Sequence, residues 1–411
     1  MRRRSPLVGA ALSAALVLTA CGSDSGSPDN QNVINVPGDA PTIQEAVDMA
    51  VPGDLILVEQ GVYAESVTVD VDDIVIRGVD RNKVILDGEG RFGNGIRVAG
   101  ANGVAIENMT ARDYQQNGFY WTEAVGYRAS YLTAVRNGLY GIYAFDAEGG
   151  VIEHSYASGH PDAGFYIGQC DPCDAVIRNS IAEYNGLGYS GTNASNNLYI
   201  INNVFRFNNT GIMPNSGDYE KRWPQSSTVF AGNLVHSNNG PAPGLLPLLR
   251  INGHGILISG GLSNTVVRNR VFDHDQAGIG VIANFMGRSF PSNDNVIEQN
   301  HVSRSGVADL VLSSTETARN CFVGNTASSA QPASLLRLTS CADAPATIPA
   351  AGAYPIADVL KRAPELQVRR KDVADPPPQP NMPDARTAPA VPASPVPPKV
   401  DLDDITLPDA P

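Results

Sequence analysis

A glycine that returns every 23 residues constrains this chain more than any other feature. The interval is 23 residues throughout, except for 24 before Gly188 and 44 before Gly255. The recurring glycines are Gly95, Gly118, Gly141, Gly164, Gly188, Gly211, Gly255 and Gly278. A period of this size indicates a solenoid, a propeller or an array of repeats.

Each period contains short runs rich in Val, Ile and Phe that end in Asn, Gly or Asp, for example "AIENMTARD", "VIEHSYASG" and "IINNVFRFN". Such runs are typical of short strands that end in turns. Helix-length amphipathic patterns are absent between them, and a propeller blade needs about 40–45 residues. Three short strands per turn therefore predict a parallel β-helix. We expect an internal ladder of stacked amides from the recurring asparagines Asn108, Asn179, Asn203, Asn269 and Asn300.

The turns of the form I-x-N and G-I/F-Y resemble the right-handed β-helix repeats of pectin-lyase-like proteins. The opening "PTIQEAVDMAVPGDLILVEQGVYAESVTV" resembles the start of many exported members. The resemblance extends from about residue 33 to 341. It implies an all-β, right-handed parallel β-helix, a fold that hosts lyases, hydrolases, epimerases and adhesins.

The segments "GFYWTE", "GIYAFD" and "GFYIGQ" occupy the same place in three successive turns. Alternation along a strand sends the residues one and three places after each glycine inward and the residue between them outward. Tyr120, Tyr143 and Tyr166 should therefore stand on one exposed face, about 4.8 Å apart. A polar column lies two places beyond the inner one: Glu123, Asp146, Gln169 and Asn193.

We predict that this face binds a polysaccharide or cell-wall glycan, because tyrosine offers a flat apolar ring with a polar tip. Tyr120, Tyr143, Tyr166, Gln169 and Asn193 are the expected ligand-binding residues. Glu123 and Asp146 are candidates for acid–base catalysis, as in a lyase, hydrolase or epimerase, or for a Ca²⁺ site, and the sequence does not decide whether the protein is an enzyme. No other cofactor is expected.

Two rival hypotheses stay open. In one the tyrosines only form a ladder in a structural or adhesive rod, and in the weaker one the protein handles metals, although its six His and six Met are scattered. Three motifs also suggest sites: "GHPD" at 159–162, "GHG" at 253–255 and "DHD" at 273–275. "GHG" resembles the His motif of polygalacturonases but lacks the paired Asp upstream, and "DHD" resembles the motif of alginate epimerases without its Pro. We interpret all three motifs as solvated turns.

The first 20 residues have the pattern of a signal peptide: a basic start, then the apolar run "PLVGAALSAALVLTA". "LTAC", ending at Cys21, resembles the lipobox of bacterial lipoproteins, which implies lipidation of Cys21 and export to the outer side of a cell membrane or outer membrane. Residues 21–32 would be a flexible tether. Removing Arg2, Arg3 and Arg4 takes the formal net charge from −13 to −16. Nucleic acid is therefore not an expected partner.

An exported chain with four further cysteines suggests two disulfides. "CDPC" lies between strand-like runs rather than at a helix N-terminus, so we predict a Cys170–Cys173 loop staple and not a redox motif. Cys321 and Cys341 lie 20 residues apart, about one repeat, and form the second predicted pair.

The predicted β-helix domain covers residues 33–345. "TIQEAVDMA" should form a short helix that caps its open end, with Thr42 and Glu45 in capping-box spacing. The 21 extra residues before Gly255 fall into two insertions, "PNSGDYEKRWPQSS" (214–227) and "GPAPGLLPLLRING" (240–253), which should wall a cleft on the tyrosine face. Residues 346–411 are predicted to be a disordered tail, because sixteen of the 30 prolines lie between Pro345 and Pro411.

Overall fold

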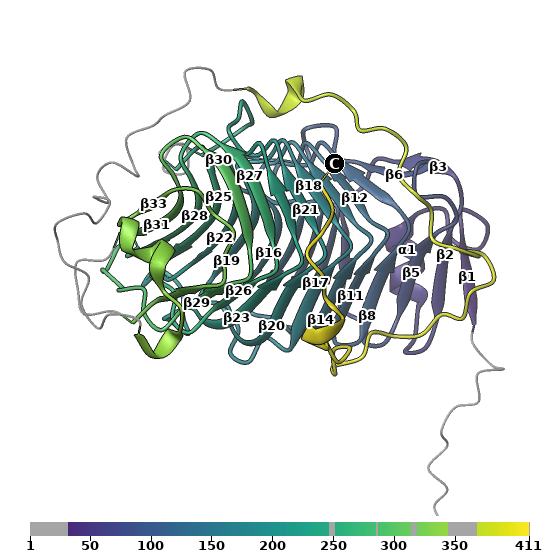
Figure 1. The fold of residues 1–411 in the computed structure, drawn as a ribbon. Coiled ribbons are helices and arrows are strands. Elements are labelled where there is room, and N and C mark those ends of the chain that lie inside the picture. The colour runs from purple at the N-terminus through teal and green to yellow at the C-terminus, as the bar shows by residue number, and fades with distance from the viewer. Residues whose placement is uncertain (1–31, 246–250, 285–286, 314–318, 344–367, 411) are drawn as a thin grey trace, which may run out of the picture. The chain divides into compact units, whose positions relative to one another are not determined.

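The computed structural model describes residues 32–245, 251–284, 287–313, 319–343 and 368–410. The predicted signal peptide and most of the predicted tether, with Cys21, lie outside the described residues. The chain winds through three parallel sheets, A, B and C, and from residue 55 to residue 313 each turn adds one strand to each sheet (Figure 1). The predicted right-handed parallel β-helix is confirmed, and each layer supplies the neighbouring layer with its backbone hydrogen-bond partners.

The strands of sheet A are β1 (Val33–Val36), β2 (Leu55–Val58), β5 (Val75–Gly78), β8 (Val104–Glu107), β11 (Val125–Ser130), β14 (Glu148–Glu153), β17 (Ala175–Arg178), β20 (Ser195–Ile201), β23 (Ser226–Ala231), β26 (Thr265–Val267), β29 (Val296–Glu298) and β32 (Cys321–Val323). Those of sheet B are β3 (Gly61–Tyr63), β6 (Val84–Asp87), β9 (Thr110–Arg112), β12 (Thr133–Val135), β15 (Tyr156–Ser158), β18 (Ile181–Glu183), β21 (Val204–Arg206), β24 (Leu234–His236), β27 (Arg270–His274) and β30 (His301–Ser305). Those of sheet C are β4 (Val67–Val69), β7 (Ile96–Ala99), β10 (Phe119–Thr122), β13 (Ile142–Phe145), β16 (Ala163–Gly168), β19 (Leu187–Thr192), β22 (Thr210–Asn215), β25 (His254–Ser259), β28 (Ala277–Ile282), β31 (Ala308–Ser313) and β33 (Ala330–Gln331).

The helix α1 (Ile43–Met49) lies where the sequence predicts a cap. The Thr42 hydroxyl accepts a hydrogen bond from the Glu45 amide at 3.1 Å, so Thr42 is the N-cap residue. Ile43, Ala46 and Val47 are buried in the main core, which closes the first turn of the solenoid. Short 3₁₀ turns complete the described elements: η3 (Ala333–Arg337), η4 (Cys341–Asp343), η5 (Arg370–Asp372) and η6 (Leu402–Asp404).

Amide ladders inside the solenoid are present, but with different members from those expected. One ladder contains Asn203, Asn233, Asn269, Asn300 and Asn325, each amide bonding to the next. Asn203, Asn269 and Asn300 are thus predicted correctly. Asn108 and Asn179 do not stack in it: both have left-handed backbone, with φ of 56° and 51°, and occupy turns.

A second ladder combines four amides with two imidazoles: Asn137, His160, Asn185, Asn208, Asn238 and His274. His160 and His274 are 0% and 2% exposed, and burial lowers the pKa of each imidazole to about 3, so both stay neutral. The interpretation of "GHPD" and "DHD" as solvated turns is therefore wrong for the two histidines, which are buried rungs. The interpretation is also wrong for "GHG", because His254 lies buried in β25, where its Nδ1 accepts from the Ala277 amide.

Both predicted disulfides are confirmed: Cys170–Cys173 and Cys321–Cys341. The second links the last strand of sheet A to the 3₁₀ turn η4. The disulfide therefore crosslinks β32 to the segment that follows β33.

The described part of the C-terminal segment, residues 368–410, packs along the outside of the solenoid (yellow in Figure 1). Its contacts run from Arg136 through Asn82 to Glu59, toward the first turns, and then return through Arg128 to Arg270. The prediction of a disordered tail is therefore wrong for these residues. Ile405 shows why, because its side chain is only 4% exposed in an apolar cluster on sheet A.

Candidate functional site

A pocket opens on sheet C where the outward column of side chains changes from large to small. Tyr120, Tyr143 and Tyr166 occupy this column on β10, β13 and β16, and the next strand β19 carries Ser190 at the same register. A serine after three tyrosines leaves a hollow one side chain deep. The pocket has a volume of about 230 Å³.

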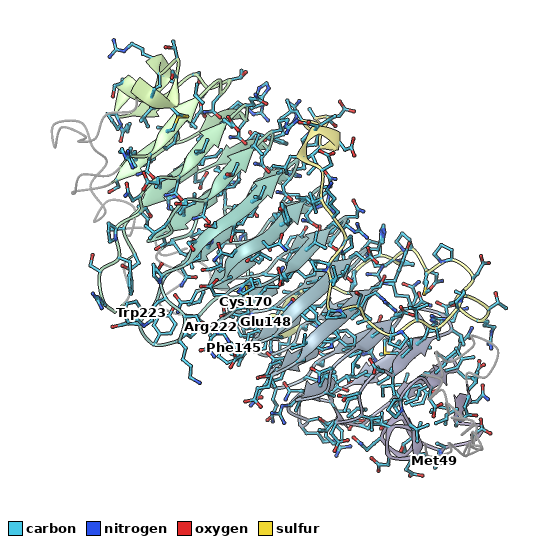
Figure 2. All side chains as sticks on the ribbon, turned by 90° about the horizontal axis from the view of Figure 1, so that it is seen from below. Met49, Phe145, Glu148, Cys170, Arg222 and Trp223 are labelled. Atoms are coloured by element: carbon cyan, nitrogen blue, oxygen red, sulfur yellow. A yellow bond between two sulfur atoms is a disulfide. The ribbon has the colours of Figure 1, made fainter. Side chains whose placement is uncertain are left out.

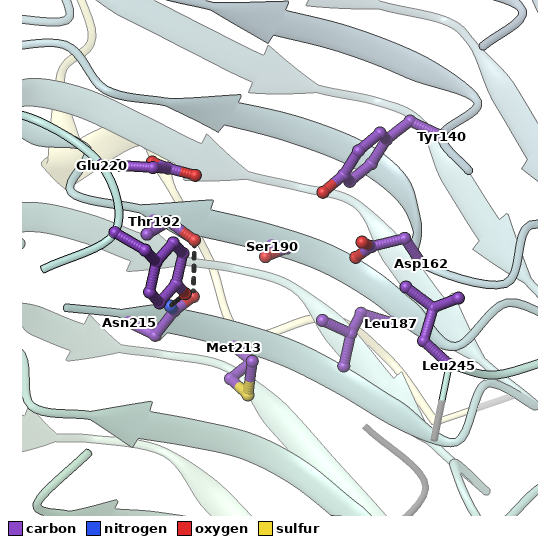
Figure 3. Close-up of a pocket in the computed structure, with 10 residues that line it drawn as sticks. Tyr140, Asp162, Leu187, Ser190, Thr192, Met213, Asn215, Glu220 and Leu245 are labelled. Carbon is purple, nitrogen blue, oxygen red and sulfur yellow. Dashed lines mark hydrogen bonds between the residues drawn. The ribbon is translucent and has the colours of Figure 1, made fainter. Parts of the chain in front are cut away.

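The two insertions wall this pocket, as the sequence predicts. Tyr219 and Glu220 come from the first insertion and Leu245 from the described part of the second. The other lining residues come from the strands or the turns before them: Tyr140, Asp162, Leu187, Ser190, Thr192, Met213 and Asn215. Figure 3 shows Glu220 and Asp162 on opposite sides of Ser190, with Leu187 and Met213 beneath.

Glu220 is held in place by a buried tyrosine. The Tyr166 hydroxyl donates to both carboxylate oxygens of Glu220, at 3.0 and 3.2 Å. The pKa of the Glu220 carboxyl is raised to about 7, chiefly by burial; the Tyr166 hydrogen bond lowers it and the charge of Asp162 raises it, each by less. Glu220 is therefore about half protonated near neutral pH.

Asp162 is the second carboxyl group of the pocket. It lies in the turn before β16, and burial raises the pKa of its carboxyl to about 6, while hydrogen bonding by the Tyr140 hydroxyl acts in the opposite direction. At neutral pH Asp162 is mostly ionised and Glu220 is partly protonated. Two carboxyl groups with different and near-neutral pKa values can share acid and base roles.

No Lys, Arg or His side chain is among the described residues that line the pocket. The remaining polar groups are small or neutral. The Thr192 hydroxyl donates to Asn215 Oδ1 at 3.1 Å, and the Asn215 amide donates to the Tyr219 hydroxyl at 3.0 Å (Figure 3). The pocket therefore offers hydroxyl and amide groups to a neutral polar ligand and little compensation to an anionic one.

The tyrosine column exists, but it is not an open platform. Tyr166 is 1% exposed and its hydroxyl is bonded to Glu220, so its predicted place on an exposed face is wrong. Tyr120 and Tyr143 are half-buried, with ring centroids 4.8 Å apart. The Tyr143 ring stacks on Tyr140 at 4.3 Å, and Tyr140 lines the pocket. Tyr143 therefore reaches the pocket through Tyr140, and the ligand-binding role of the column stays a prediction.

The predicted polar column has a different origin. Glu123, Asp146, Gln169 and Asn193 all have left-handed backbone, with φ between 49° and 54°, because the chain turns there from sheet C to sheet A. Asp146 and Asn193 suit this corner because Asp and Asn tolerate left-handed backbone better than most residues, and Glu123 and Gln169 lack the β-branch that disfavours it most.

Two members of this column hold the first insertion in place. Gln169 Oε1 accepts from the Lys221 amide at 2.9 Å. The Asn193 side chain accepts from the Gly217 amide and donates to its carbonyl, at 3.0 and 2.7 Å. Gln169 and Asn193 are 5% and 0% exposed and do not line the pocket, and their predicted ligand-binding role stays a prediction.

Glu123 and Asp146, the predicted catalytic or Ca²⁺-binding pair, do not line the pocket. Arg222 of the first insertion lies 3.9 Å from Asp146 and 3.3 Å from Glu148, and Figure 2 shows Arg222 beside Glu148 with Trp223 further along the same loop. Across the part of the chain that the structure describes, no group of three or more His, Cys, Asp or Glu side chains is placed to hold a metal. The pair is therefore separate from the two acids of the pocket.

Sequence reasoning missed Asp162 and Glu220 as site residues. Asp162 belongs to "GHPD", and Glu220 to the first insertion, for which the sequence predicts only a wall of the cleft. One signal was available, because Asp162 comes two residues before a repeat glycine, where the turn enters the tyrosine face. Nothing in the sequence indicates that a residue 58 positions later approaches it.

Comparisons with known proteins agree with this architecture. Residues 61–223 match the family model described as "right handed beta helix region". The chain is a right-handed parallel β-helix. No curated protein shows significant sequence similarity to it.

Solved structures in which the chain follows a similar path include three β-helix proteins. The A-module of the mannuronan C-5 epimerase AlgE4 from Azotobacter vinelandii has 16% identity and a TM-score of 0.49, over 72% of this chain and 92% of that one. The pectate lyase Pel9A has 13% identity and a TM-score of 0.40, over 85% and 94%. The enzymatically active domain of tailspike protein 2 from bacteriophage CBA120 has 12% identity and a TM-score of 0.47, over 72% and 48%.

Proposed function

We propose that the pocket between the two insertions binds one unit of a glycan chain and that Glu220 and Asp162 hydrolyse the adjacent glycosidic bond. One observation carries the proposal: two carboxyl groups with pKa values of about 7 and about 6 face the same hollow. Glycoside hydrolysis commonly needs one protonated and one ionised carboxyl group flanking the bond that breaks. The environment of this pocket supplies both states near neutral pH.

The roles follow from the two pKa values. Glu220, with the higher pKa, donates its proton to the glycosidic oxygen as the bond to the sugar breaks. The Asp162 carboxylate takes a proton from the attacking water, or forms the glycosyl ester that water then cleaves. Tyr166 keeps Glu220 oriented through its hydroxyl and is a positioning residue.

The shape and polarity of the pocket support a glycan ligand. Its volume of about 230 Å³ is below the ~300–1,000 Å³ of pockets for larger ligands and suits a single small ring. The half-buried Tyr140 ring offers an apolar face, and Ser190, Thr192 and Asn215 offer hydrogen bonds. A uronic acid would bring a third carboxylate close to two acids without a cation among the described lining residues. We therefore expect a neutral sugar and hydrolysis rather than elimination or epimerisation at a uronate.

A product analysis tests this function. Wild-type protein would be incubated with neutral and uronic polysaccharides, and new reducing ends and unsaturated products would be measured separately. We expect new reducing ends from a neutral glycan, with loss of at least ~10²-fold in Glu220→Gln and in Asp162→Asn. Glu123→Gln, a Glu→Gln change outside the pocket, should keep the wild-type rate. Unsaturated products, or a Glu123→Gln variant as impaired as Glu220→Gln, would contradict the proposal.

Attachment to the cell envelope is a separate proposal that rests on the sequence of residues 18–21. Within the ranges that the structure covers, no helix has the length and apolar character needed to cross a membrane. We propose that lipidated Cys21 attaches the protein to a membrane face outside the cytoplasm. If the protein with Cys21→Ala still partitions wholly with membranes, lipidation of Cys21 is not the anchor.

A further inference from the structure

Arginines on the outer surface of sheets A and B bind backbone carbonyls of the proline-rich C-terminal segment. Arg77 is 0% exposed and donates to the carbonyls of Ala388 and Pro389, at 2.7 and 3.0 Å. Further along, Arg128 donates to the Val391 carbonyl at 2.5 Å and to the Pro392 carbonyl at 3.5 Å. The same pattern recurs between Arg81 and Pro380, Arg136 and Val373, and Arg270 and Pro408.

The chemistry of this recognition suits proline. A proline-rich segment is extended, has few N–H groups and leaves its carbonyls free for outside donors. A guanidinium group has five N–H donors and no acceptor, so it can hold two such carbonyls at once. Arg77 and Arg128 each do so, and both also contact Glu107, which fixes their direction.

Two side-chain amides set the register of the segment. Asn82 Oδ1 accepts from the Gln379 amide at 2.8 Å, and its Nδ2 donates to the Gln379 carbonyl at 2.9 Å. Asn108 Oδ1 accepts from the Met382 amide at 2.8 Å. Asn108 has left-handed backbone outside the amide ladder, and this contact gives its buried side chain a partner in the segment.

Apolar residues anchor the far end. Ile405 is 4% exposed and packs in a cluster on the outer face of sheet A that contains Val176, Ile201, Ala231 and Val267. Gly232 keeps this place open, since a Cβ atom there would lie 2.5 Å from Ile405 Cγ2. Val396 of the same segment, by contrast, is 73% exposed, so it is a branched apolar side chain suited as a control for Ile405.

We propose that this outer surface is a binding groove for an extended proline-rich segment, occupied here by the chain's own residues 369–408, and that the same segment of a second copy can take its place. On the solenoid side, the groove consists of a row of arginines, two asparagine side chains that fix the register of the segment, and an apolar cluster that receives Ile405. All of these contacts are non-covalent, and every copy carries the matching sequence. The groove lies on sheets A and B, whereas the candidate glycan pocket lies on sheet C, so the proposal is independent of the proposed function.

The experiment uses the full chain with a protease site inserted between Ala350 and Ala351. After cutting, size-exclusion chromatography shows whether the released segment stays with the solenoid. A labelled peptide with the sequence of residues 369–410 is then added in excess, and its exchange with the cut segment is measured. We expect co-elution after cutting and displacement by the labelled peptide.

Peptide variants keep the test independent of the folding of the solenoid. Ile405→Ser in the peptide should weaken competition by about tenfold or more, because it removes a buried branched side chain. Val396→Ser is the matched control and should compete within about twofold, in line with exposed positions. Separate elution of the cut segment, failure of the labelled peptide to exchange, or equal competition by a peptide of scrambled sequence would overturn the proposal.

Discussion

Replacing Glu220 by Gln should make the protein more stable at high pH and leave it nearly unchanged at low pH. The pKa of the Glu220 carboxyl is raised from 4.5 to about 7 in the folded protein. The folded state therefore binds its proton more tightly than the unfolded state between these two values. The contribution to stability is fully present below pH 4.5 and is lost as the pH rises through about 7.

The size of this effect follows from the shift. At about 1.4 kcal/mol for each pKa unit, ionised Glu220 lowers the free energy of unfolding by up to about 3 kcal/mol at pH 8. Glutamine cannot ionise and can still accept the hydrogen bond from Tyr166. Glu220→Gln should therefore exceed the wild type by several degrees in melting temperature at pH 8 and by almost none at pH 4. The same variant should lose hydrolytic activity, as in other trade-offs between stability and activity at strained sites.

The assay is a melting curve by calorimetry at pH 4, 6 and 8 for the wild type, Glu220→Gln and Glu123→Gln. Glu123 is exposed, so its variant should stay within about 0.5 kcal/mol of the wild type at every pH. An offset between Glu220→Gln and the wild type that is the same at pH 4 and pH 8 would refute the reasoning. It would show that the Glu220 carboxyl is not destabilised by burial.

Three further changes test other parts of the structure. Asn208→Ala removes a buried ladder rung that bonds to Asn185 and Asn238, and denaturant unfolding should show a loss of about 1–3 kcal/mol, whereas Asn179→Gly at an exposed left-handed turn should change little. A chain that ends at residue 345 should melt several degrees lower, because burial of Ile405 alone stabilises by about 1.5–3 kcal/mol; an unchanged melting temperature would mean that the C-terminal contacts are worth little. Tyr143→Ala should weaken glycan binding in calorimetric titration by about 1–2 kcal/mol through loss of the stack under Tyr140, whereas Tyr143→Phe keeps the ring and should keep the affinity.

The sequence period predicts the fold because a parallel β-helix depends on contacts between equivalent residues of adjacent turns. The 23-residue spacing of the repeat glycines places Tyr120, Tyr143 and Tyr166 in register, and the structure pairs them accordingly. The same local logic correctly predicts α1, both disulfides and the cleft between the two insertions. It fails for the corner residue Glu123 and its equivalents, because a polar column looks the same whether a ligand or a left-handed turn requires it.

The C-terminal segment shows a different limit. Its composition predicts disorder because a proline-rich chain buries little apolar surface by itself. The evidence against disorder lies in the solenoid, where outward positions of sheet A such as Val176, Ile201 and Val267 are apolar. An apolar outer face of a sheet predicts that another segment covers it. Only the structure shows that residues 369–408 are that segment.

The sequence by itself determined the repeat, the strand faces, the cap and the crosslinks of this protein, since each depends on neighbours within one turn or at one fixed period. Only the tertiary structure decided that Asp162 and Glu220 share a pocket, that His160 and His274 are ladder rungs, and that Arg77 binds the far end of the chain. The pairings of Asp162 with Glu220 and of Arg77 with the C-terminal segment join a repeat to an insertion or to a non-repeating segment, for which no period sets the distance. The raised pKa of Glu220 and the lowered pKa of His160 also depend on the tertiary structure, because burial and neighbouring charges arise only once the chain has folded.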